Sequence, residues 1–166
     1  TYNDAIIYEL HVRDLSSDES SGIQNTGKFL GLTETGTTTA SGIPTGLDHM
    51  KDLGITHLHL LPVYDYASVD ETQSDKPQFN WGYDPENYNV PEGSYSTDPY
   101  NGVVRVAEMK QMVKALHDNQ ISVIMDVVYN HVYNASDFCV NQIVPGYFSR
   151  VNEDGTYSNG SDCGND

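Results

Sequence analysis

The chain has 166 residues, of which 24 are acidic and 8 are Lys or Arg, so its formal net charge at pH 7 is −16. Such a surface repels nucleic-acid phosphates and anionic lipid headgroups, and we expect no nucleic-acid partner. No stretch approaches the ~20 consecutive apolar residues of a membrane span, so we expect no membrane partner either.

The first part of the chain predicts a strand followed by a long loop. Residues 5–12 (AIIYELHV) are rich in β-branched and aromatic residues, which favours a strand. The run 16–41 is dominated by Ser, Thr, Gly and acidic residues, with one apolar knot at 29–32. We expect this run to be a loop that contributes nothing to the core.

A helix and a second strand come next. Thr45 and Asp48 resemble a capping box at the start of the helix, and Gly54 marks its end. Residues 55–61 (ITHLHLL) follow at once and predict a strand that stops at Pro62.

The remaining regular elements lie between two more loops. Residues 63–101 form a second long polar and aromatic loop. A helix is predicted over 103–117, with one apolar stripe at Met109, Met112, Val113 and Leu116. Residues 121–128 (ISVIMDVV) are almost uniformly apolar, which predicts a parallel strand that is covered on both faces.

The order of these elements predicts the fold class. Strands and helices alternate, with short turns from helix to strand and long loops from strand to helix, which is typical of α/β proteins with a parallel sheet. In such folds the functional loops follow the carboxyl ends of the strands. Three strands cannot close a barrel, so we expect the chain to be incomplete as a folding unit.

Two motifs lie in those long loops. Asp126 interrupts the third strand, and a buried carboxylate needs a partner, either an Arg in another strand or the groups of an active site. Asn130 and His131 follow four and five residues later. The stretch 79–85 (FNWGYDP) combines Trp81 and Tyr83 with a glycine that lets the backbone approach closely; its rings suit either loop packing or stacking on sugars.

These motifs resemble those of a known family. The stretch 126–131 (DVVYNH) is similar to the first conserved region of the α-amylase superfamily of glycoside hydrolases. The stretch 79–85 is similar to the type I pullulanase signature YNWGYDP. Four further matches keep the same order along the chain: YELHVRDLS, KFLGLTE, HLHLLPVYDY and NGSDCGND.

The resemblance covers essentially the whole chain and implies its fold. Residues 1–166 would be the N-terminal portion of a catalytic (β/α)8 TIM barrel, roughly strands 1–3 with helices 1–2 and long βα loops. This portion would be incomplete alone, and its partners would be the remainder of the catalytic domain and an α-glucan polysaccharide.

The resemblance also implies roles for individual residues. Tyr83 would stack on the sugar just before the scissile bond, and His131 would hydrogen-bond a hydroxyl of that sugar. Asp126 would orient an active-site Arg supplied by the fourth strand. Trp81, Asp84 and Asn165 would line the cleft.

Two positions depart from the family's pattern. Phe79 lacks the hydroxyl of the signature Tyr, which removes one hydrogen bond. Asn119 stands at a helix end where relatives have Gly, and we expect it to serve there because Asn also enters the left-handed region.

The implied activity is retaining hydrolysis of α-1,6-glucosidic branch linkages in pullulan, starch or glycogen. In this starch-debranching family the nucleophilic Asp and the acid Glu follow strands four and five. The chain ends before them, so we expect it to supply substrate-binding residues and the site floor, and to be inactive alone.

Three alternatives stay open. Within the family, the chain could belong to an isoamylase or a glycogen-debranching relative. His57 and His59, with Asp126 nearby, would suit a metal-dependent barrel hydrolase. A non-catalytic carbohydrate-binding module is the third, although such modules are usually β-sandwiches.

The chemistry requires no cofactor and, on the favoured interpretation, no metal, although a structural calcium ion is compatible with the acidic loops. The location in the cell stays open, with secretion or the cell surface favoured over the cytoplasm.

Overall fold

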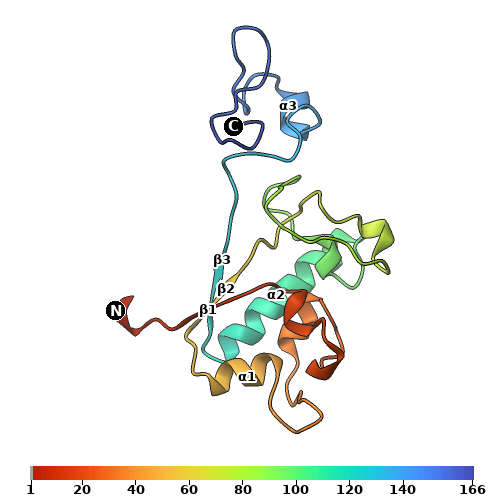
Figure 1. Ribbon diagram of the computed structural model, residues 1–166, viewed down its shortest axis with the longest axis vertical. Helices are drawn as coiled ribbons and strands as arrows, with labels where there is room; N and C mark the ends of the chain where they lie inside the picture. Colours follow the sequence, from red (N-terminus) through yellow and green to blue (C-terminus); the bar gives the residue numbers. More distant parts are fainter. Residues whose placement is uncertain (1) are drawn as a thin grey trace. The chain divides into compact units, whose positions relative to one another are not determined.

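The computed structural model of the protein describes residues 2–166, apart from the side chain of Tyr2 (Figure 1). Its contacts divide the chain into two compact units. The first unit contains the residues up to Val63 together with Pro91–Asp126, and the second contains Tyr64–Val90 and Val127–Asp166. Among the described residues, no helix combines the length and the apolar character that crossing a membrane requires.

The first unit holds all three strands and both longer helices. Its elements in chain order are η1 (Tyr2–Asp4), β1 (Ile7–Leu10), η2 (Asp14–Ser16), η3 (Glu19–Ser21), η4 (Phe29–Thr33), α1 (Gly46–Asp52), β2 (His57–Leu60), η6 (Gly93–Tyr95), α2 (Gly102–Asp118) and β3 (Ser122–Met125), where η denotes a 3-10 helix. The predicted alternation of strand and helix is confirmed.

The three strands form one parallel sheet in the order β1-β2-β3. Leu58 of β2 pairs with Tyr8 of β1 and Val123 of β3. Leu58 and Leu60 share one face, because alternate residues of a strand point the same way, and both are fully buried. The predicted α/β class with a parallel sheet is confirmed.

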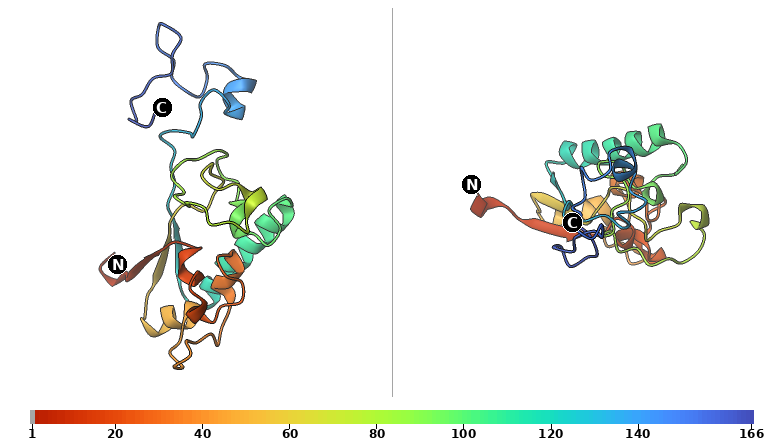
Figure 2. Two further views of the ribbon diagram at one scale, coloured as in Figure 1. Left: turned by 45° about the vertical axis from the view of Figure 1, so that its right-hand side comes forward. Right: turned by 90° about the horizontal axis from the view of Figure 1, so that it is seen from above.

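The loop expected at 16–41 is part of the core, so that expectation is wrong. Phe29 and Leu32 lie in η4 and are 0% and 1% exposed, and Ile23 is also buried. Helix α2 packs against η4 as well as against β3, as Figures 1 and 2 show. The prediction failed because the stretch is mostly polar, whereas only its few large apolar residues pack in the core.

Helix α1 begins and ends where expected, but the capping box is wrong. The Thr45 hydroxyl donates to the Ser21 carbonyl and lies 2.9 Å from Thr37 Oγ1 instead of capping the helix. The Asp48 carboxylate accepts from the Gly36 N–H. Both side chains therefore tie the preceding loop to the helix. Gly54 follows the helix with φ +68°, the left-handed conformation that glycine adopts without strain.

Helix α2 matches its prediction to within one residue at each end. The Asn101 side chain caps it by accepting from the Val103 N–H. Of the predicted stripe, Met112 and Leu116 are fully buried. The expectation for Asn119 is wrong: its φ is −99°, and Gln120 takes the left-handed conformation with φ +62°. Asn119 Nδ2 instead donates to the carbonyl of Ala115, which still satisfies the helix end.

Strand β3 is shorter than expected and is not covered on both faces. It spans four residues, so Asp126 follows the strand instead of interrupting it. Met125 is 39% exposed, and on β1 Ile7 is 56% exposed. Apolar residues that remain exposed on the strands are what an incomplete parallel sheet would leave.

The second unit has little regular structure. It contains only η5 (Glu71–Gln73) and α3 (Cys139–Ile143), and α3 lies in a stretch where no helix was predicted. Its core is the cluster of Val132, Ala135 and Phe138, against which Tyr88 and Tyr157 pack. Loops with this little regular structure need side chains to satisfy their buried backbone groups.

Candidate sugar-binding site

His131 and Tyr83 lie in contact within the second unit, although 48 residues separate them in sequence. The His131 Nε2 atom is 2.9 Å from the Tyr83 carbonyl oxygen and donates to it. His131 is 9% exposed, and Tyr83 is half-buried. The structure therefore brings the two residues of the two sequence motifs to one place.

One polar atom of His131 is left open by this arrangement. With Nε2 held by the Tyr83 carbonyl, the buried Nδ1 atom has no hydrogen-bond partner among the described residues. Buried polar atoms without a partner are rare and cost free energy, and at a functional site a ligand can satisfy them. Nδ1 can accept from, or in the protonated ring donate to, a ligand hydroxyl.

Asp84 adds a second such atom. The residue is 7% exposed, and its Oδ1 atom also has no hydrogen-bond partner in the described part of the chain. Burial raises the pKa of Asp84, because it disfavours the charged carboxylate, while Ser68 and, to a smaller extent, the nearby His131 work in the opposite direction. An acceptor and an imidazole nitrogen thus lie open in the same small region.

Aromatic rings stand next to these groups. Trp81 is 50% exposed, and its ring centroid lies 5.9 Å from that of Tyr83 at a tilt of 54°. Gly82 joins them with φ +84°, a conformation that a residue with a side chain rarely adopts. Phe79, at the departure from the family signature, is 76% exposed.

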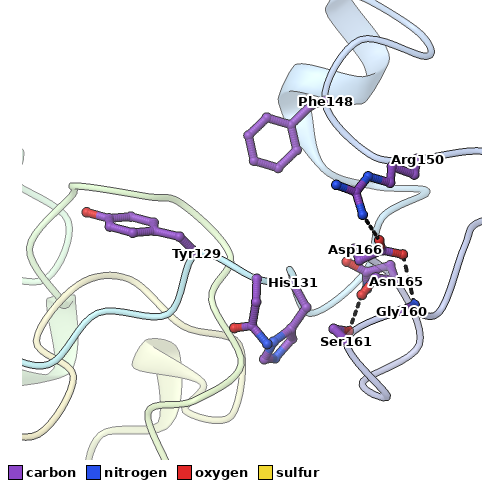
Figure 3. Close-up of a pocket in the computed structure, with 9 residues that line it drawn as sticks. Tyr129, His131, Phe148, Arg150, Gly160, Ser161, Asn165 and Asp166 are labelled. Atoms are coloured by element: carbon purple, nitrogen blue, oxygen red, sulfur yellow. Dashed lines mark hydrogen bonds and ion pairs between the residues drawn. The ribbon is translucent and has the colours of Figure 1, made fainter.

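A hollow of about 400 Å³ opens beside His131, and Figure 3 shows its lining. Asn165, predicted to line the cleft, is among the lining residues. The others are Tyr129, Asn130, His131, Phe148, Arg150, Gly160, Ser161 and Asp166. The lining is mostly polar, with the rings of Tyr129 and Phe148 added to it.

The far wall of this hollow is held by Asp166. Its carboxylate accepts from Arg150 Nη1 at 2.9 Å and from the Gly160 N–H at 3.0 Å. Hydrogen bonds from Ser158 and Gly160 lower the pKa of Asp166, and Arg150 adds to the effect, because all three favour the charged carboxylate. The Asp166 carboxylate is therefore ionised at neutral pH and forms an ion pair with Arg150.

Sequence reasoning missed the aromatic residues that support the site. Tyr88 donates its hydroxyl to the His131 carbonyl at 2.6 Å, and burial, with Tyr64 and Tyr129 adding to it, raises its pKa to about 12. Tyr129 stacks on Tyr64 with their centroids 6.1 Å apart. The chain has 12 tyrosines, and this number indicates that aromatic packing matters. It does not indicate which rings lie in contact.

Asp126 belongs to the first unit. Its Oδ2 atom lies 4.0 Å from His59 Nε2, and the other ring nitrogen of His59 lies 3.5 Å from Glu9 Oε2. The Nδ1 atom of His57 forms a hydrogen bond with the hydroxyl of Thr56. Among the described residues, neither histidine belongs to a group of three side chains arranged to hold a metal ion. This arrangement does not favour the metal-hydrolase alternative.

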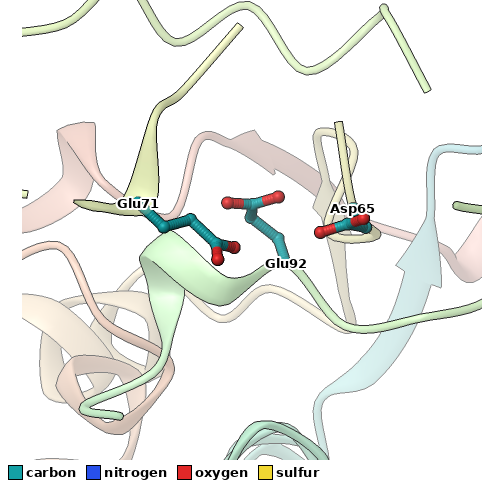
Figure 4. A group of neighbouring side chains, drawn as sticks. All are labelled: Asp65, Glu71 and Glu92. Carbon is teal, nitrogen blue, oxygen red and sulfur yellow. The ribbon is translucent and has the colours of Figure 1, made fainter. Parts of the chain in front are cut away.

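Figure 4 draws three acidic side chains, Asp65, Glu71 and Glu92. Asp65 and Glu71 belong to the second unit, whereas Glu92 belongs to the first. Glu92 has a local role, because its carboxylate accepts from the Ser94 N–H at the start of η6. Neither unit by itself supplies three acidic ligands here.

Comparison with known protein families identifies the class of protein to which this parallel α/β fold belongs. Residues 25–143 match the family model described as alpha amylase, catalytic domain. The chain belongs to this family.

Its relatives narrow the resemblance to pullulanases. The chain is 50% identical over 165 residues to the pullulanase of Bacillus subtilis, with 98% of this chain and 23% of that protein covered. It is 59% identical to the pullulanase of Paenibacillus barengoltzii, crystallised with maltohexaose and α-cyclodextrin, at a TM-score of 0.93 over 98% of this chain and 25% of that one. The pullulanase of Bacillus acidopullulyticus gives 50% identity and a TM-score of 0.91, covering 98% of this chain and 20% of that one.

These comparisons confirm the resemblance to the α-amylase superfamily and its pullulanases. The chain spans about a quarter of the length of the relatives that it matches.

Proposed function

We propose that this chain is the N-terminal part of the catalytic barrel of a retaining glycoside hydrolase that cleaves α-1,6-glucosidic branch linkages in pullulan, starch or glycogen. The observation that carries the proposal is the contact between His131 Nε2 and the Tyr83 carbonyl, which leaves the buried Nδ1 atom open. Support comes from the pullulanase relatives and from the maltohexaose complex of one of them.

The geometry suggests how the site would hold a sugar. The ring of Tyr83 would stack on the apolar face of a glucose residue, with Trp81 beside it. His131 Nδ1 would bond a hydroxyl of that glucose, and this bond would strengthen as positive charge develops at the anomeric carbon. The open Oδ1 atom of Asp84 would accept from a second hydroxyl.

The bond-breaking groups would come from outside this chain. Retaining hydrolysis uses a nucleophilic carboxylate and an acid/base carboxylate about 5–5.5 Å apart. We assign neither role to an Asp or Glu of this chain. Asp126, directly after β3, would orient an Arg that a further strand supplies. The remainder of the catalytic domain is therefore a required partner, on the same chain or a second one.

The test compares the chain with the longer protein that carries the rest of the barrel. Both are incubated with pullulan, and reducing-end release and product size are measured. We expect no turnover by the 166-residue chain and maltotriose from the longer protein. Turnover by the chain alone would mean that its own carboxylates catalyse the reaction, and cleavage of glycogen but not pullulan would favour the isoamylase-like alternative.

Metal dependence is tested in the same assay. Treatment with a calcium chelator should leave kcat unchanged, since the proposed chemistry uses carboxylates only, while a lowered Tm would indicate a structural calcium ion.

A further inference from the structure

Asn165 uses both ends of its side-chain amide on the backbone of one distant residue. Its Oδ1 atom accepts from the Val132 N–H at 2.9 Å, and its Nδ2 atom donates to the Val132 carbonyl at 2.7 Å. Asn165 is 4% exposed and Val132 is 2% exposed. A carboxamide has a donor and an acceptor at a fixed spacing, so this pair of hydrogen bonds fixes the orientation of the Val132 backbone.

The first of these bonds acts on the peptide group that joins His131 to Val132. The carbonyl of that peptide accepts from the Tyr88 hydroxyl at 2.6 Å, and its N–H donates to Asn165. Because a peptide group is planar, holding it at both ends fixes the position of the His131 Cα atom and restricts the direction of its side chain. The next N–H, that of Tyr133, donates to the Pro85 carbonyl at 2.8 Å.

Asn165 is itself held in place by its neighbours. The Arg150 N–H donates to the Asp166 carbonyl at 2.8 Å, and the Asp166 carboxylate binds Arg150 and Gly160. The Ser161 hydroxyl donates to the carbonyl of Asn165. The loop therefore presents the Asn165 amide from a fixed position, with its polar groups committed to Val132 rather than to the hollow.

We propose that Asn165 is a positioning residue, which orients the His131 imidazole through the His131–Val132 peptide so that Nδ1 meets the substrate hydroxyl. This proposal rests on the proposed function for its catalytic consequence. It differs from a direct sugar contact by Asn165, because the effect of Asn165 must then pass through His131.

The experiment is a double-mutant cycle in the longer protein. Asn165→Ala is measured in the wild-type background and in the His131→Ala background, with kcat and KM for pullulan as readouts. In the wild type we expect a fall in kcat/KM of about 10-fold or more, since small misplacements of a binding group have effects of that size. In the His131→Ala background we expect a further fall of less than about 2-fold, because the interaction is already absent. Equal losses in both backgrounds would show a direct contact and overturn the proposal.

Asn152→Ala is the matched control. Asn152 also bonds a neighbouring backbone and side chain, Tyr157 O and Thr156 Oγ1, but it is exposed and does not line the hollow. Its substitution should leave kcat/KM unchanged. Asn165→Asp keeps the acceptor for the Val132 N–H but replaces the donor with an oxygen that faces the Val132 carbonyl, so its kcat/KM should also fall below that of the wild type.

A second readout separates this proposal from the proposed function. In the same protein, hydrogen exchange of the Val132 amide should be slow in the wild type and at least about 10-fold faster in Asn165→Ala, because the N–H loses its acceptor. The NMR resonances of the His131 ring should also shift in Asn165→Ala. If the wild type does not cleave pullulan but these changes occur, the proposed function fails and the positioning role stands. Unchanged exchange and ring resonances would overturn the positioning role.

Discussion

The two units of this chain are stabilised in different ways. The first unit has a parallel sheet and two helices, and its core consists of apolar side chains at regular spacing, such as Leu58, Leu60, Met112 and Leu116. The second unit has one short α-helix and relies on side chains that bond distant backbone groups: Tyr64 on Val128, Tyr88 on His131, Asn165 on Val132. The candidate sugar-binding groups belong to the second unit.

This difference shows why the site lies where it does. A regular ladder satisfies its own backbone groups and leaves side chains free for packing, whereas an irregular loop must use polar side chains to satisfy buried N–H and C=O groups. The same polar side chains can hold a functional group such as His131 in a fixed direction. This difference between the units is not absolute, because the loop at 16–41 in the first unit also uses polar side chains to bond backbone groups.

The largest expected effect is a loss of stability, and it tests whether the first unit depends on its apolar core. Phe29→Ala in η4 should lower the free energy of unfolding by about 3–5 kcal/mol, because it empties a fully buried site between elements of the first unit. Phe79→Ala is the matched control at 76% exposure and should change stability by less than about 0.5 kcal/mol. Urea denaturation of both variants tests this, and equal losses would mean that η4 is not core.

The second effect concerns activity instead of stability. In the longer protein, Tyr83→Ala and His131→Ala should each lower kcat/KM for pullulan by about 10²-fold or more, on the order of 3 kcal/mol of transition-state stabilisation. Tyr147→Ala, at 79% exposure, is the control and should retain the wild-type rate. Wild-type kinetics for either of the first two variants would remove that residue from the site.

The third effect tests the side-chain bonds of the second unit. The buried Tyr64 hydroxyl donates to the Val128 carbonyl at 2.7 Å and accepts from the Val128 N–H. Tyr64→Phe leaves both groups unpaired, so the free energy of unfolding should fall by about 1–3 kcal/mol. Tyr147→Phe serves as the exposed control. A loss no larger than that of the control would mean that water satisfies Val128 equally well.

The smallest effect sharpens the comparison at the loop of the first unit. Desolvation raises the pKa of Glu34, but hydrogen bonds from the Gln24 N–H and from the N–H and side chain of Asn25 outweigh it, so the pKa lies below 4.5. A lowered pKa in the folded state stabilises the fold above the unfolded pKa and loses that stabilisation as the pH falls through the folded value.

Glu34→Gln should therefore cost about 1 kcal/mol at pH 7, and this cost should shrink as the pH falls through the lowered pKa of Glu34, where the wild type also loses the charge. Thermal unfolding between pH 3 and pH 7 measures the difference, with the exposed Glu153→Gln as control. A difference that is constant with pH would show that the Glu34 charge is not involved.

Much of the regular structure could be predicted because its signals are local. The apolar stripe of α2, the glycine after α1 and the β-branched runs of the strands act within a few residues of one another. The Thr45 capping box failed because Thr45 and Asp48 bond the loop before the helix, contacts that local spacing does not reveal. The core position of Phe29 was missed for the same reason.

For the site, the motifs pointed to Tyr83, Asp84 and His131, and the fold brings these residues together. The pairing of Nε2 with the Tyr83 carbonyl and the bonds of Tyr88 and Asn165 could not be predicted, since they join residues 33 to 48 positions apart through loops without a repeat.

The sequence by itself determined the strand–helix alternation, the parallel sheet and the family, because each depends on short motifs or on their order. Only the tertiary structure decided which polar atoms remain open and which are used to hold the loops. The physical reason is that a hydrogen bond between distant segments depends on where the whole chain places them, and the residues at its two ends carry no local mark of each other.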